Sequence, residues 1–171
     1  GITEVSINSG MDVILKDLDD KIIHQARKNI WKNLSRKVKR RQMSKVLAKT
    51  TAQRAIGQLD YKGFENVDVV VEAIVENMSV KKKLIKELEG ICNEDFIFAS
   101  NTSSLPLTEM SEDAKKPENV VGMHYFSPVT KMPLLEIIKT NKTSNQAIAT
   151  CYEIGKRPVS YTHLTLPTKD S

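Results

Sequence analysis

Short runs of branched apolar residues recur along the chain, and between them apolar residues are spaced three or four positions apart. The first pattern is typical of buried strands and the second of amphipathic helices. Because the two alternate through short loops, we expect an α/β fold, a doubly wound and mainly parallel sheet of the Rossmann kind. Strands are predicted at residues 11–17, 58–60, 67–73, 96–99, 120–123 and 134–139, and helices beginning near residues 19, 79, 106 and 144.

Two of the predicted helices have a distinct apolar face. The first is capped by Asp19 or Asp20 and continues as a basic helical segment to about Lys49. Its inward residues are expected to be Ile22, Ile23, Ala26, Ile30 and Leu34. In the helix over residues 79–91 the expected inward residues are Val80, Leu84, Ile85, Leu88 and Ile91, with four lysines facing outward.

The composition is that of an ordinary globular protein. With 171 residues, 40% hydrophobic and 27% charged, the chain can bury one substantial core, and one domain is the default. Cys92 and Cys151 lack the spacing of metal ligands and are too few for a disulfide scaffold, so we expect no metal and a reducing compartment. No apolar run is long enough for a transmembrane segment and no signal-like segment opens the chain, which predicts a cytosolic or matrix protein.

The net charge of +5 is concentrated in residues 27–49. A solvated helix face is the simplest interpretation. An anionic small molecule is the main alternative, because fixed positive charge attracts phosphate groups. Nucleic acid is disfavoured, since Trp31 is the only aromatic residue in this segment that could stack on a base and no recognition motif accompanies it.

Candidate catalytic groups follow three of the apolar runs. His124 ends the run Gly-Met-His-Tyr, and its imidazole can take a proton near neutral pH if an acceptor orients the ring. Glu136, in Leu-Leu-Glu-Ile-Ile, is the candidate acceptor, because a carboxylate in an apolar strand requires a partner. Ser103 and Asn101 could contact a substrate oxygen and a nicotinamide. The simpler alternatives are a paired ion without chemistry and helix-capping polar residues.

Carboxylates at two other strand ends fit a dinucleotide. Asp17 ends the run 11–17 and could accept hydrogen bonds from the hydroxyls of an adenosine ribose, which favours NAD over NADP because a carboxylate repels a 2′-phosphate. Glu72 and Glu76 lie at the end of the run 67–73, where a cofactor ribose would cross the sheet. Each carboxylate taken alone could equally be a strand-end cap.

Both ends of the chain differ from the pattern of a whole domain. The first predicted strand is of the kind that is normally second in a dinucleotide fold, so we expect the opening strand and its glycine-rich turn to be missing. Residues 159–168 have neither helical nor strand periodicity and resemble the translation of a transposase-end sequencing adapter. We therefore predict a native domain at residues 1–157 and a non-native tail at 158–171, in which His163 has no function; an unstructured native tail is the alternative.

Four motifs in order resemble one enzyme family. They are Ile-Leu-Lys-Asp, Val-Val-Glu-Ala-Ile-Val-Glu-Asn, Phe-Ala-Ser-Asn-Thr-Ser-Ser-Leu-Pro and the segment from Gly122 to Ile138 that contains His-Tyr-Phe-Ser-Pro. The combination is similar to the NAD-binding domain of the L-3-hydroxyacyl-CoA dehydrogenases, and the His-Tyr-Phe-Ser-Pro form is closest to the α-subunits of multifunctional fatty-acid oxidation complexes. The resemblance extends from Gly1 to about Thr150.

The resemblance implies roles at the reacting centre. His124 would be the catalytic base, Glu136 its partner, and Ser103 a contact to the substrate hydroxyl. Glu76 with Lys81 would lie on the nicotinamide side of NAD.

Further roles follow on the cofactor and substrate sides. Asp17 would bind the adenosine ribose, and Asn101 belongs to the cofactor-facing motif. Gly1 matches the last glycine of the glycine-rich turn. Arg40 matches a lysine near the 3′-phosphate of coenzyme A, and Asn33 replaces a serine near it.

The sequence also departs from the family at several positions. Thr3 and Glu4 stand where Ala and Gln are usual, and Ser127 stands where the single-function enzymes have asparagine. The segment 148–155 is about one helical turn shorter than its counterparts, and the family's helical C-terminal domain is missing.

The resemblance implies an enzyme that oxidises L-3-hydroxyacyl-CoA to 3-ketoacyl-CoA with NAD in fatty-acid β-oxidation, while the fragment itself would be inactive. The full protein is expected to bind acyl-CoA, to be oligomeric, with a thiolase subunit as one candidate partner, and to be cytoplasmic in a bacterium or in the mitochondrial matrix of a eukaryote. Two alternatives are a non-catalytic nucleotide or acyl-CoA binding module and another dehydrogenase on this scaffold, such as one for 3-hydroxybutyryl-CoA or a sugar acid.

Overall fold

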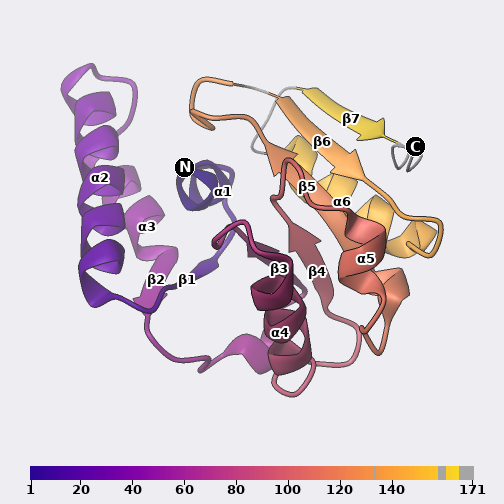
Figure 1. The fold of residues 1–171 in the computed structure, drawn as a ribbon. Coiled ribbons are helices and arrows are strands. Elements are labelled where there is room, and N and C mark those ends of the chain that lie inside the picture. Colours follow the sequence, from indigo (N-terminus) through magenta and orange to yellow (C-terminus); the bar gives the residue numbers. More distant parts are fainter. Residues whose placement is uncertain (133, 158–160, 166–171) are drawn as a thin grey trace. The chain divides into compact units, whose positions relative to one another are not determined.

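The computed structural model describes residues 1–132, 134–157 and the backbone of 161–165 (Figure 1). The helices are α1 (Ile2–Asn8), α2 (Asp20–Lys39), α3 (Lys45–Gln53), α4 (Met78–Leu88), α5 (Leu107–Ser111) and α6 (Asn145–Lys156), with 3-10 turns η1 (Phe64–Asn66) and η2 (Pro117–Asn119). The strands are β1 (Val13–Lys16), β2 (Ala55–Gln58), β3 (Val69–Glu72), β4 (Ile97–Ser100), β5 (Val120–Tyr125), β6 (Leu134–Ile138) and β7 (Tyr161–Thr165).

The chain consists of two compact units, Gly1–Lys62 and Gly63–Ser171. In the first, β1 and β2 form a parallel pair; in the second, the strand order is β3-β4-β5-β6-β7. All neighbours in the larger sheet are parallel except β5 and β6. The predicted α/β fold with mainly parallel strands is confirmed. In a dinucleotide fold with strand order 3-2-1-4-5-6, β1 and β2 correspond to strands 2 and 3, and β3, β4 and β5 correspond to strands 4, 5 and 6. Strand 1 of that order has no counterpart among the described residues.

The first unit packs three helices and two strands around a small apolar core. Its buried members are Ile7, Ile30, Leu34, Ala48 and Ala55, one or two from each of α1, α2, α3 and β2. The predicted strand at residues 58–60 is wrong by three residues, because β2 begins at Ala55 and Gln58 is its last residue. The sequence pattern misplaces this strand because no apolar run marks it. The strand instead packs closely against α2, where a Cβ on Gly57 would lie 2.3 Å from Ile23.

The basic segment is not one continuous helix to Lys49. Arg41 adopts a left-handed conformation with φ 58°, and its N–H donates to Val38 O while Gln42 N–H donates to Lys37 O. These are the two bonds of a Schellman motif, which ends a helix by satisfying its last carbonyls. Ser44 then caps α3 by accepting from the Leu47 N–H. Periodicity alone could not reveal this break, because neither glycine nor proline marks it.

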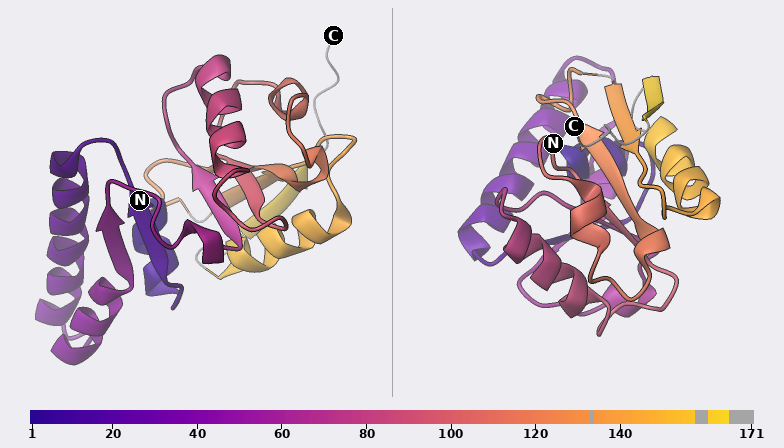
Figure 2. Two further views of the ribbon diagram at one scale, coloured as in Figure 1. Left: turned by 90° about the horizontal axis from the view of Figure 1, so that it is seen from below. Right: turned by 45° about the vertical axis from the view of Figure 1, so that its right-hand side comes forward.

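The second unit is layered. Figure 2 shows α4 and α5 on one face of the five-stranded sheet and α6 on the other. Alternation along β6 explains the packing, because Leu135 and Ile137 are fully buried and a Cβ on Gly155 of α6 would lie 2.3 Å from Leu135. Gly122 of β5 faces the opposite side, toward Leu107 of α5. Residues of β5 and β6 that share the Gly122 face therefore project on the α5 side.

The two edges of the larger sheet differ from expectation. The apolar run at 67–73 predicts a strand covered on both sides, but β3 pairs only with β4 and its valines are half-buried. The sequence pattern predicts no strand at residues 159–168. This prediction is wrong for residues 161–165, which form β7 and pair in parallel with β6. Backbone groups of an edge strand can pair without any side-chain periodicity in the partner. The rest of that segment lies outside the described residues, and its non-native origin stays a prediction.

Replacement of Gly122 by alanine tests the close approach that joins β5, β6 and α5. A Cβ there would lie 2.7 Å from Leu107 Cδ1 and 2.9 Å from Ile138 Cβ, and the second atom cannot move without its strand. We expect Gly122→Ala to lower the free energy of unfolding by about 1–3 kcal/mol, measured by urea denaturation. Gly90→Ala is the control, because its nearest neighbour would be 3.4 Å away, and an equal effect of the two changes would contradict the packing described.

Candidate active site

His124 and Glu136 are direct cross-strand partners in the antiparallel pair β5–β6. His124 Nδ1 lies 3.0 Å from Glu136 Oε2, and the side chains are 20% and 33% exposed. The expectation that these groups follow neighbouring strand ends is wrong in detail, because both lie within strands and face each other through the register. The predicted pairing of base and carboxylate is confirmed as a contact.

The pair has the geometry of a general base. An ionised carboxylate can only accept a hydrogen bond, so the Nδ1 of His124 carries the proton when Glu136 is ionised, and Nε2 then presents a lone pair. No hydrogen-bond partner of Nε2 occurs among the described residues. The Phe126 ring packs against the imidazole with centroids 4.6 Å apart, which limits rotation of the ring. This arrangement can accept a proton at a defined position.

A second polar cluster lies where β3 and β4 end, and its centre is a buried ion pair. Lys81 Nζ lies 2.6 and 2.8 Å from the two oxygens of Glu72, and each side chain is 1% exposed. The prediction that all four lysines of α4 face outward is wrong for Lys81. Val80, predicted inward, is exposed instead, because the ion pair rotates the helix so that Lys81, Ile85 and Leu88 face the sheet.

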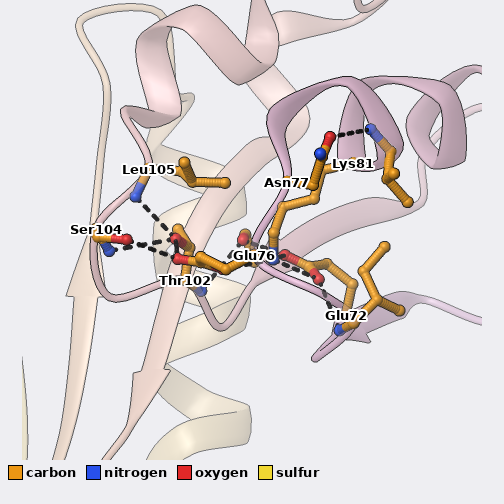
Figure 3. Close-up of polar contacts among 10 residues, drawn as sticks. Glu72, Glu76, Asn77, Lys81, Thr102, Ser104 and Leu105 are labelled. Atoms are coloured by element: carbon orange, nitrogen blue, oxygen red, sulfur yellow. Dashed lines mark hydrogen bonds and ion pairs between the residues drawn. The ribbon is translucent and has the colours of Figure 1, made fainter.

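Glu76 bridges this ion pair to the loop after β4 (Figure 3). Its Oε2 lies 3.2 Å from Lys81 Nζ, while Oε1 accepts from the hydroxyls of Thr102 and Ser104. Partial burial alone would raise the pKa of Glu76, but the bonds from Thr102, Lys81 and Ser104, together with the charge of Lys81, lower it from 4.5 to about 2. Glu76 is thus an ionised carboxylate at neutral pH, and its side chain is 39% exposed.

The loop over residues 101–105 places the predicted polar residues. Thr102 Oγ1 accepts from the N–H groups of Ser104 and Leu105, which forms a tight turn with Ser103 exposed at its tip. Asn101 Oδ1 accepts from the Tyr125 N–H at 2.8 Å and so ties this loop to the end of β5, one residue from His124. The side-chain oxygen of Asn101 is therefore used within the protein, and Ser103 is accessible.

The other predicted residues belong to the first unit. The Asp17 carboxylate accepts from the N–H groups of Leu18 and Asp19 at the end of β1 and remains partly exposed. Gly1 is exposed and precedes α1. Neither residue has an interaction that prevents it from contacting a ligand.

The two residues assigned to coenzyme A are placed differently from each other. Asn33 Nδ2 donates to both carboxylate oxygens of Glu4 at 3.0 Å, and Glu4 is buried. Glu4 stands where the family usually has Gln, and Asn33 satisfies its buried carboxylate within the first unit. Arg40 is exposed at the C-terminal end of α2 and keeps its charge available.

Sequence reasoning did not assign a role to Ser100, Thr102 and Ser104, and it left Glu72 without a partner. A signal was present: Lys81, Ile85 and Leu88 follow helical spacing, so one lysine occupies an inward position. Glu72 ends a strand of valines, where a buried carboxylate requires a cation. The two observations together indicate the ion pair.

A pocket of about 310 Å³ lies elsewhere in the second unit, beside Phe96, Phe98 and Val120 where β4 and β5 begin. None of the predicted site residues lines it. Some of its polar groups are already paired, for example the Lys115 N–H with Glu89 at 2.6 Å. Shape alone does not make this pocket the reactive site.

Each unit carries a partly exposed carboxylate whose chemistry suits a ribose of NAD. Asp17 and Glu76 are partly exposed carboxylates held from inside by N–H, hydroxyl or ammonium donors, and such groups accept hydrogen bonds from ribose hydroxyls. In the part of the chain that the structure describes, no three His, Cys, Asp or Glu side chains are placed to hold a metal ion. No helix of the described ranges is long and apolar enough to cross a bilayer.

Comparisons with known proteins show the family of the chain. The family described as 3-hydroxyacyl-CoA dehydrogenase, NAD binding domain, matches residues 1–163. The chain is 44% identical over 149 residues to the fatty acid oxidation complex subunit alpha of Idiomarina loihiensis, which covers 87% of this chain and 21% of that protein. It is 40% identical to the glyoxysomal fatty acid beta-oxidation multifunctional protein MFP-a of Brassica napus, over 92% of this chain and 22% of that protein. The chain spans about a fifth of the length of these relatives.

Solved structures give the same result. The 3-hydroxybutyryl-CoA dehydrogenase of Escherichia coli K12 superposes with a TM-score of 0.93 at 28% identity, over 98% of this chain and 35% of that one. The (S)-3-hydroxybutyryl-CoA dehydrogenase of Ralstonia eutropha superposes with a TM-score of 0.92 at 28% identity, over 98% of this chain and 59% of that one. The predicted Rossmann-like fold, the family resemblance and the NAD cofactor are confirmed. The chain belongs to the 3-hydroxyacyl-CoA dehydrogenase family and matches the NAD-binding domain of that family, and its cofactor is NAD.

Proposed function

We propose that the full-length protein containing this chain oxidises L-3-hydroxyacyl-CoA to 3-ketoacyl-CoA in fatty-acid β-oxidation. The observation that carries the proposal is the 3.0 Å contact between His124 Nδ1 and Glu136 Oε2, which orients a base of the kind that alcohol oxidation requires. The names of the relatives, which include a fatty acid oxidation complex subunit alpha, support the pathway.

Three residues have chemical roles in the proposed reaction. His124 Nε2 takes the proton of the substrate's 3-hydroxyl group, and the C–O bond becomes a carbonyl as C3 loses a hydride. NAD, when bound, accepts that hydride on its nicotinamide ring. Glu136 stabilises the imidazolium through a charge-assisted hydrogen bond at Nδ1. The exposed hydroxyl of Ser103 is assigned to the substrate oxygen, which it holds by donating a hydrogen bond.

The remaining assignments concern binding. Asp17 and Glu76 accept from the two riboses of NAD, Lys81 supports Glu76, and Asn101 holds the cofactor-facing loop. Gly1 lies on the pyrophosphate side. Arg40 attracts the 3′-phosphate of the coenzyme A portion, with Asn33 beside it on α2.

The wider context remains a set of predictions. The name of one relative, a multifunctional protein, supports a multifunctional chain, and an enoyl-CoA hydratase domain in that chain is part of the proposal. An oligomer, a thiolase subunit as partner and a cytoplasmic or mitochondrial location are proposals of the same kind. Purification of the native protein with its associated chains tests the first two of these.

A short-chain 3-hydroxybutyryl-CoA dehydrogenase is the second candidate function. It is favoured by the two solved structures of that name, both with TM-scores above 0.9 at 28% identity. Rates with acyl-CoA substrates of increasing length separate the two functions. A non-catalytic binding module is less consistent with the site, because it has no use for an oriented histidine and carboxylate pair.

Removal of the imidazole tests the assignment of the base. We expect His124→Ala in the full-length protein to lower kcat by at least about a hundredfold, because a positioned base contributes roughly 10²–10⁴ to the rate. NADH formation measured by absorbance is the readout. His24→Ala is the matched control, since His24 is exposed and pairs only with Asp20 on the surface of α2, and it should leave kcat unchanged. Undiminished turnover of His124→Ala would remove His124 from the mechanism.

Neutralisation of the partner carboxylate tests the second member of the pair. Glu136→Gln is expected to lower kcat by about tenfold to a hundredfold while the affinity for NADH stays constant, because the imidazolium loses a charged acceptor but the cofactor contacts remain. Steady-state kinetics and NADH fluorescence titration measure the two effects. Glu153→Gln, which alters an exposed ion pair with Lys156, is the control. A fall in NADH affinity without a fall in kcat would assign Glu136 to binding instead.

A further inference from the structure

Hydrogen bonds and ion pairs around Glu72 form a closed ring, and Figure 3 labels four of its members, Glu72, Lys81, Glu76 and Thr102. Lys81 Nζ contacts both oxygens of Glu72 and, at 3.2 Å, Glu76 Oε2. Thr102 Oγ1 donates to Glu76 Oε1, and the Thr102 N–H donates to Ser100 Oγ at 3.2 Å. Ser100 Oγ donates back to Glu72 Oε1, which completes the ring. The ring links β3, α4 and the loop after β4 through side chains and the backbone N–H of Thr102.

Glu72 itself cannot reach a ligand. Its side chain is 1% exposed, and its oxygens accept from Lys81, from the Ser100 hydroxyl and from the Ile74 N–H. A buried carboxylate with this many donors is stabilised in one position, and the low local dielectric makes each bond strong. Its effect on function must therefore pass through the residues that it holds.

Two branches lead from Glu72 to the exposed site. Through Lys81 it reaches Glu76, whose inward lone pairs are used by Lys81, Thr102 and Ser104 while part of the carboxylate stays open to solvent. Through Ser100 it reaches Thr102, whose hydroxyl closes the turn with Ser103 at its tip. Lys81 is 1% exposed and so acts within this network rather than on the cofactor.

We propose that Glu72 is a positioning residue that fixes the Glu76 carboxylate through Lys81 and the Ser103 turn through Ser100. This positioning role rests on the proposed function, in which Glu76 faces NAD and Ser103 faces the hydroxyacyl substrate. One buried carboxylate thereby couples the geometry of the cofactor contact to that of the substrate contact.

Charge removal at Glu72 tests the first branch in the full-length protein. Glu72→Gln is expected to raise the Kd for NADH, measured by fluorescence titration, about tenfold, because Lys81 loses its main partner and is drawn onto Glu76. The same variant leaves the buried Lys81 cation with Glu76 as its remaining carboxylate partner and lowers the thermal midpoint. The double variant Glu72→Gln/Lys81→Met removes both charges, so its thermal midpoint should recover toward that of the unmodified protein while the Kd for NADH stays raised.

A double-mutant cycle with Glu76 identifies the route. Adding Glu72→Gln/Lys81→Met to a Glu76→Gln protein should cause no further rise in the Kd for NADH if Glu72 acts through Glu76. Lys82→Met is the control on the same helix, because Lys82 pairs with the surface residues Glu112 and Asp113, and it should leave the Kd unchanged.

Removal of one uncharged donor tests the second branch. Ser100→Ala is expected to raise the KM for the hydroxyacyl substrate by about fivefold, the usual worth of one hydrogen bond, with a smaller effect on the Kd for NADH. An unmodified protein that does not bind NADH would overturn both the proposed function and this role. If it binds NADH, unmodified affinity in the Glu72→Gln/Lys81→Met variant, or an unchanged KM in Ser100→Ala, would overturn the positioning role alone.

Discussion

The antiparallel register of β5 and β6 is the constraint on which the candidate active site depends. It places His124 directly opposite Glu136, and side-chain alternation then sends Leu135 and Ile137 to the face covered by α6. A slip of one residue would move the carboxylate to the buried face and separate it from the histidine. The apolar packing under α6 therefore fixes the register, and the register fixes the distance between base and acceptor.

The protein accommodates two carboxylates in apolar strands by different means. Glu136 stays partly exposed and has one partner, which leaves its charge free to stabilise an imidazolium. Glu72 is fully buried and is satisfied by a lysine, a hydroxyl and a backbone N–H, which leaves it no outward function. The number of donors to each carboxylate thus separates one whose charge remains partly available from one whose acceptor sites are used within the protein.

Hydrogen bonds hold the elements that carry the candidate site residues. His124 and Glu136 lie on paired antiparallel strands, and the polar loop over residues 101–105 is closed by hydrogen bonds to Thr102 and tied to β5 by Asn101. Glu76 joins that loop to α4. Such support suits the proposed function, because small displacements of reacting atoms are costly in rate.

The sequence by itself determined the α/β class, most strand and helix positions, a helix cap at Asp19 or Asp20, and the residues that carry the family motifs, because these depend on local periodicity and residue type. It could not determine that β6 runs antiparallel to β5, since one apolar run serves either direction. It indicated an inward Lys81 only in combination with Glu72, and it could not show that α2 ends just before Arg41. The tertiary structure decided these, because a buried charge is tolerated only where a partner from another strand meets it, and strand direction is set by which register buries the apolar face.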